Sequence, residues 1–266
     1  VTLSCAAFFA VWIPVALALR YWSSSSKLPE KEKKENGSDS EERDTKPLGY
    51  ADNGSMQVAS MIHCVFVLYR ATVVISGMSW NQLDDFYAFS PYIQDTFSFT
   101  AGYFLWDLIV TLCSNSSPLF AVHALSCLTV YLMGHFPFLH YIGTVYLMFE
   151  ASTPFLNIRR LLSLCGMKET RIYRVNEMVF GLVFIAVRII CGVPMSILFL
   201  YKMLSWIGAN VAQPPVHSYF AVLFNIIGNV VLTRLNIHWA CQMLRKACGP
   251  ANEDDRVPEK PAEKVD

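Results

Sequence analysis

Apolar runs long enough to cross a lipid bilayer alternate along this chain with segments that hold most of its charge. The 266 residues are 54% hydrophobic and only 16% charged, whereas soluble domains average about 25% charged residues. Because a bilayer core offers no water to unpaired backbone groups, apolar segments of about 20 residues are expected to cross it as helices. The sequence therefore predicts an all-α polytopic membrane protein. It shows no basic patch with interleaved aromatics of the kind that binds nucleic acid.

We expect seven helical spans in this chain. The short fifth span would cross the bilayer only in part, or where the bilayer thins locally. Residues 1–22 also fit a signal peptide, but they show no clear small-residue cleavage site, and we favour a first transmembrane helix. The expected spans cover residues 2–22, 57–78, 95–114, 118–134, 141–156, 176–200 and 218–240.

Two segments contain too little apolar sequence to bury a core. Segment 23–56 includes SSSS and the charge run KEKKENGSDSEERD, and segment 245–266 is rich in Pro, Glu and Lys. We therefore expect a disordered charged linker over 23–56 and a disordered tail over 245–266. Between them, residues 57–244 are expected to form a six-helix membrane domain, with residues 1–22 as a separate first helix.

Lys and Arg are distributed unequally between the two sets of loops. Segments 23–56, 157–175 and 241–266 hold six, five and five basic residues, whereas the three alternate loops together hold only Lys202. Basic loops of membrane proteins stay on the cytosolic side. We therefore expect a lumenal N-terminus, and a cytosolic linker and C-terminal tail.

Polar and ionisable residues interrupt the apolar runs at similar depths in five of the expected helices. A charge at the bilayer centre costs about 2.5–3.5 kcal/mol on insertion scales, so such groups face the protein interior. Any one of them could be a helix-to-helix contact, but a layer shared by five helices favours a polar cavity open toward the cytosol. The candidate cavity-lining residues are His63, Arg70, Tyr103, Asp107, His123, Glu150, Asn157, Arg188, Asn229 and Arg234.

Several motifs in this sequence resemble those of the TLC-domain family, which includes ceramide synthases and translocation-associated membrane proteins. The most specific is E-x-S-T-P-F-x-N-x-R, from Glu150 to Arg159. Within the family, the branch typified by TLC domain-containing protein 4 is the most similar. The resemblance implies six core helices around a cavity that holds a lipid chain, usually in the endoplasmic reticulum. It runs from about Ser60 to Leu244 and includes SMIHCVFVLYR (60–70), FTAGYFLWDLIV (99–110), VHALSCL (122–128) and FEASTPFLNIRRLL (149–162).

Three functions are compatible with the resemblance and the polar layer. The first is a protein that handles a membrane lipid or acyl chain and influences lipid homeostasis, without a cofactor or bound metal. The second is an acyl-CoA-dependent acyltransferase with His123 as base and Asp107 orienting it. Ceramide synthases carry adjacent histidines, however, and here Ala124 follows His123, which counts against ceramide synthesis and against an enzyme. The third is a trafficking protein that acts through cytosolic segments such as 23–56.

Overall fold

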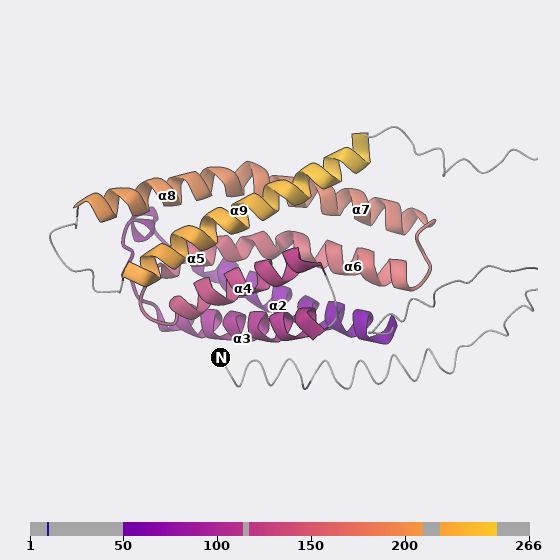
Figure 1. The fold of residues 1–266 in the computed structure, drawn as a ribbon, viewed down its shortest axis with the longest axis horizontal. Coiled ribbons are helices and arrows are strands. Elements are labelled where there is room, and N and C mark those ends of the chain that lie inside the picture. The colour runs from indigo at the N-terminus through magenta and orange to yellow at the C-terminus, as the bar shows by residue number, and fades with distance from the viewer. Residues whose placement is uncertain (1–9, 11–49, 114–116, 210–218, 249–266) are drawn as a thin grey trace, which may run out of the picture.

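The computed structural model describes residues 10, 50–113, 117–209 and 219–248. Regular structure within these ranges is entirely helical (Figure 1), which confirms the predicted all-α class. The first expected span, the linker up to residue 49 and the tail from residue 249 lie outside the described residues, apart from the single residue 10. The α-helices are α2 (Tyr50–Gly77), α3 (Pro91–Cys113), α4 (Pro118–Met133), α5 (His140–Leu147), α6 (Thr153–Leu164), α7 (Arg171–Phe184), α8 (Gly192–Ala209) and α9 (Tyr219–Cys248).

Four helical segments in the described part are long and apolar enough to cross a membrane, and the chain is an integral membrane protein. In Figure 1 the long helices run roughly along one direction, and α9 runs obliquely across the bundle beside α4. Helix α4 is apolar but shorter than these four. The four segments are Gly54–Gly77, Pro91–Cys113, Arg171–Gly208 and Tyr219–Cys248.

The helices extend beyond several of the expected boundaries. Helix α2 begins at Tyr50, so residues 50–56 are helical and not part of the linker, and α9 continues to Cys248, past the expected start of the tail. Helices α5 and α6 are joined by a 3₁₀ segment, η2 (Met148–Ser152), which makes the fifth helical segment longer than the expected 141–156. The added turns contain charged residues. One of them, Arg159, is paired with Glu177 of α7 at 3.1 Å.

Two prolines account for irregular backbone in the middle of the fold. Pro154 has no N–H to donate to the carbonyl of Glu150, and the N–H of Thr153 bonds to that carbonyl instead, which is the 3₁₀ pattern of η2. Pro194 likewise leaves the carbonyl of Ile190 without its usual donor. Just before it lies the π-helical segment η3 (Ile185–Cys191), which joins α7 to α8.

The turn between α4 and α5 is held by His140, which is completely buried at the start of α5. Its Nε2 lies 3.0 Å from the carbonyl oxygen of Gly134 and 3.1 Å from that of Phe136. The N–H of Ser90 donates to its Nδ1 at 3.3 Å. Nε2 therefore carries the proton and the ring is neutral, and burial lowers the pKa of His140 below its ordinary value of 6.5.

Because the folded protein keeps His140 neutral, acid should weaken the fold. The unfolded chain takes up a proton on His140 as the pH falls below about 6.5, whereas the folded chain takes it up only at a lower pH. The contribution of neutral His140 to the free energy of unfolding is therefore complete above pH 6.5 and decreases below it. We expect the melting temperature in detergent to fall less between pH 7.5 and pH 5.5 for His140→Gln than for the parent. An equal loss in both proteins would show that His140 does not contribute to the acid sensitivity.

Candidate functional site

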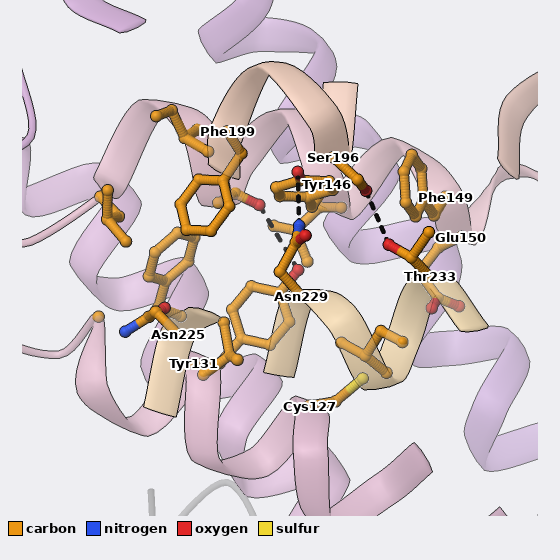
Figure 2. A pocket seen from close by; sticks show the side chains of 18 of the residues that line it. Cys127, Tyr131, Tyr146, Phe149, Glu150, Ser196, Phe199, Asn225, Asn229 and Thr233 are labelled. Atoms are coloured by element: carbon orange, nitrogen blue, oxygen red, sulfur yellow. Dashed lines mark hydrogen bonds between the residues drawn. The ribbon is translucent and has the colours of Figure 1, made fainter. Parts of the chain in front are cut away.

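Two cavities lie inside the helical bundle and meet in its middle. The larger, here called the vestibule, has a volume of about 760 Å³ and lies between α2, α3, α4, α6, α7 and α9. The smaller, here called the inner chamber, has a volume of about 80 Å³ and is formed by α3, α4, α5, α8 and α9, with η2 and η3 (Figure 2). Both are lined by Phe104, His123, Glu150 and Arg188, which therefore mark the junction between them.

The residues that line the vestibule include several at the turn from α6 to α7 and in the last turns of α9, and these segments lie toward one end of the bundle (Figure 1). Lys168 and Lys246 line the vestibule there, and this is the end that the charge distribution predicts to be cytosolic. Glu177 accepts from both Arg159 and Lys246 at 3.1 Å, and so links α6, α7 and α9 beside the vestibule.

A buried ion pair between Glu150 and Arg188 is the centre of the junction. The side chain of Arg188 is 8% exposed and that of Glu150 is 14% exposed, and their closest N and O atoms are 3.9 Å apart. Arg188 also donates from Nη1 to Asn236 Oδ1 at 3.0 Å, and Thr153 donates its hydroxyl to Glu150 Oε2 at 2.7 Å. The pair thus connects η2, η3 and α9, and its charges are compensated inside the bundle.

The irregular backbone of η2 provides a further acceptor for Arg188. In an α-helix the carbonyl of Phe149 would accept from the N–H of Thr153, but that N–H bonds to Glu150. The carbonyl of Phe149 instead accepts side-chain bonds from Arg188 Nε at 3.2 Å and from the Ser152 hydroxyl at 3.3 Å. Both charged residues of the pair therefore project from non-α segments, a feature that is frequent at functional sites.

Seven of the ten predicted residues line one of the cavities. Asn157, which is 2% exposed, donates to Ser60 Oγ of α2 at 3.1 Å. Asn229 donates to the hydroxyl of Tyr146 at 2.9 Å within the inner chamber. By location, Tyr103, Asp107 and Asn157 line the vestibule, Asn229 lines the inner chamber, and His123, Glu150 and Arg188 line both.

The other three residues do not line either cavity, and the prediction is corrected for them. His63 is buried behind the vestibule wall, where its ring stacks on Tyr103 at 3.9 Å. Arg70 holds α2 to α3 instead, donating from Nε to Thr96 Oγ1 at 2.6 Å and lying over the ring of Tyr92. Arg234 is exposed on α9. Residue spacing gives the depth of a side chain along its helix, but not the direction in which it points around the bundle.

In the described structure, His123 and Asp107 do not form the hydrogen-bonded pair that an acyltransferase would use as its general base. Its Nε2 lies 3.8 Å from Cys127 Sγ, one turn along α4. Its Nδ1 is buried and has no hydrogen-bond partner within the described ranges. Nor do the described residues contain a group of three or more His, Cys, Asp or Glu side chains that could hold a metal ion.

Arg160 and Ser196 are cavity residues that the sequence did not single out. Arg160 lines the vestibule, donates to Gln57 at 3.5 Å and lies 5.5 Å from the ring of Phe120. Its spacing from Thr153 and Asn157 is that of one helix face (i, i+4, i+7), so the motif itself contained the signal. Ser196 accepts from Thr233 of α9 at 2.9 Å, and a single serine in an apolar run gives no comparable signal.

The fold and the cavity define a polytopic helical membrane protein with an internal polar-lined cavity. Residues 54–245 match the TLC domain, and the chain belongs to the TLC domain family. The motif-based resemblance is thereby confirmed at the level of the family, and the branch within it stays a prediction.

Three fungal proteins are similar to this chain. An uncharacterised TLC domain-containing protein of Schizosaccharomyces pombe is 32% identical over 163 residues, which are 60% of this chain and 54% of that protein. An uncharacterised TLC domain-containing protein of Saccharomyces cerevisiae is 29% identical over 163 residues, 60% of this chain and 50% of that protein. Topoisomerase I damage affected protein 4 of the same yeast is 31% identical over 160 residues, 56% and 54% of the two chains. The chain spans about half the length of the curated relatives it matches.

Proposed function

We propose that this protein holds an amphipathic lipid or acyl chain in its cavity and thereby influences membrane lipid composition. The observation that carries the proposal is the junction at Glu150 and Arg188, where a wide polar vestibule meets an inner chamber. A lipid head group would lie in the vestibule, where Asp107 and Arg160 provide charges of both signs. Its chain would pass the junction into the inner chamber. Membership of the TLC domain family supports a lipid-related role.

The polar layer has features that helix-to-helix contacts alone do not require. Groups that only join helices are expected to satisfy one another, yet Nδ1 of His123 has no partner among the described residues. The cavity space around it is also lined by Phe104 and Phe149. Aromatic walls combined with a few converging polar groups are typical of ligand sites.

The other two hypotheses have less support. Among the described residues, the side-chain nitrogen of His123 contacts Cys127 and not Asp107. This arrangement does not favour an acyltransferase over a binding protein. Most of the linker invoked for a trafficking role lies outside the described residues. As parts of the same proposal, we place the protein in the endoplasmic reticulum, with its N-terminus lumenal and its C-terminus cytosolic.

Filling the inner chamber should reduce lipid retention. Leu232 lines the chamber on α9, whereas Val230 on the same helix is 49% exposed on the outer surface. We expect Leu232→Phe to lose most of the lipid that the detergent-purified parent retains, measured by native mass spectrometry with lipid extraction. Val230→Phe adds the same kind of ring outside the chamber and should retain the parental amount. Equal retention by both variants would contradict a lipid in the chamber.

A further inference from the structure

We propose that the inner chamber recognises a hydroxyl group on the lipid chain, so that the preferred ligand is a hydroxylated chain and not a plain hydrocarbon one. This inference rests on the proposed function and specifies the class of lipid. It is carried by a group of hydrogen-bonded side chains in the chamber and by an open polar atom of Asn229 among them (Figure 2).

Two hydrogen bonds join three helices across the chamber. The hydroxyl of Thr233 on α9 donates to Ser196 Oγ of α8 at 2.9 Å. The hydroxyl of Tyr146 on α5 accepts from Asn229 Nδ2 of α9 at 2.9 Å. All four side chains line the inner chamber, and Figure 2 shows them grouped on one side of it.

The amide of Asn229 is left half satisfied. The residue is 8% exposed, and its Oδ1 is buried with no hydrogen-bond partner in the part of the chain that the structure describes. A buried acceptor without a donor is unfavourable, so a ligand that supplies a donor gains affinity. Rotating the amide by half a turn would give Oδ1 the Tyr146 bond and leave Nδ2 open. A hydroxyl satisfies either arrangement because it both donates and accepts.

The position of Asn229 indicates a hydroxyl on the chain and not on the head group. Asn236, which contacts Arg188 at the junction, lies seven residues further along α9, and a helix rises about 10 Å over that distance. Asn229 therefore lies well inside the chamber, on the side away from the vestibule. The other walls of the chamber include Phe97, Leu147 and Phe199, which suit hydrocarbon.

The test compares saturated fatty acids with their terminal-hydroxyl counterparts of the same length, over several lengths. Each pair competes for the delipidated, detergent-purified full chain, and bound species are quantified by native mass spectrometry. At the best-fitting length we expect the parent to prefer the hydroxylated acid by about threefold to tenfold, the range that one net hydrogen bond provides. Asn229→Leu should abolish this preference while still binding the plain acid.

Asn176→Leu is the matched control. Asn176 lies on α7 outside both cavities, where its Nδ2 donates to the carbonyl of Phe155 at 2.9 Å, so this variant makes the same change away from the chamber and should keep the preference. Thermal unfolding checks that each variant is folded. Equal binding of the two acids by the parent, or a preference that survives Asn229→Leu, would overturn the hydroxyl inference and leave the proposed function standing. If neither acid binds at any length, the hydroxyl inference and the proposed function are both overturned, because an amphipathic chain then has no site. The chamber would in that case hold only water.

Discussion

Replacing Arg188 with leucine is expected to lower the free energy of unfolding by about 3–5 kcal/mol, the usual cost of removing one partner of a buried pair. Leucine leaves the carboxylate of Glu150 buried without its cation. It also removes the donors to the carbonyl of Phe149 and to the amide of Asn236. Reversible unfolding in mixed detergent micelles measures the loss.

A double-mutant cycle separates the ion pair from the other contacts of Arg188. Glu150→Gln keeps the side-chain shape and removes the charge, so the double variant Glu150→Gln/Arg188→Leu should be less destabilised than the sum of the two single variants. Arg188→Lys keeps the positive charge but not the several N–H donors of the guanidinium. We expect its loss of free energy of unfolding to lie between those of the parent and Arg188→Leu. A loss below about 1 kcal/mol for Arg188→Leu would mean that water reaches the junction and that the pair is not buried.

Gly143→Ala should destabilise the bundle by about 1–3 kcal/mol, the range for adding volume to a packed core. A Cβ at Gly143 would lie 2.6 Å from Cζ of Phe97, and a Cβ at Gly134 would clash with the same ring. The ring is 2% exposed and packs edge-on against the rings of Tyr131 and His140. Thermal unfolding of the purified variant measures the effect.

Gly181→Ala is the control for Gly143→Ala, because a Cβ at Gly181 meets no atom within 4 Å. Alanine at a helical glycine without a clash stabilises a helix by up to about 1 kcal/mol, so this variant should melt at or above the parental temperature. The double variant Phe97→Leu/Gly143→Ala should lose less free energy of unfolding than the two single variants lose together. If Gly143→Ala melts as high as Gly181→Ala, the close approach of α5 to Phe97 is wrong.

The helical class and the positions of most helices could be predicted because lipid permits few alternatives. Apolar runs of membrane length have to form helices, and the structure places helices at six of the seven expected spans, the first lying outside the described residues. The helix ends were less predictable. Charges at Arg159 and Arg160 suggested that the fifth span ends before them, but these side chains find partners in Glu177 and Gln57.

The site was only partly predictable from the sequence. Glu150 and Arg188 were found because buried charges in membrane spans are rare and need partners. Arg70 and Arg234 satisfied the same criterion but lie elsewhere, because the sequence gives depth along a helix and not the rotation of that helix in the bundle. The open amide of Asn229 depends on contacts between three helices, so no local pattern could identify it.

A cryo-EM map of the full chain in lipid nanodiscs tests the central claim most directly, since it shows what occupies the cavity. The account predicts elongated density that begins in the vestibule, passes between His123 and the Glu150–Arg188 pair, and ends beside Asn229. Density restricted to the outer surface of the bundle, with only isolated water-sized peaks in the inner chamber, would contradict it and leave the polar layer as a set of helix-to-helix contacts.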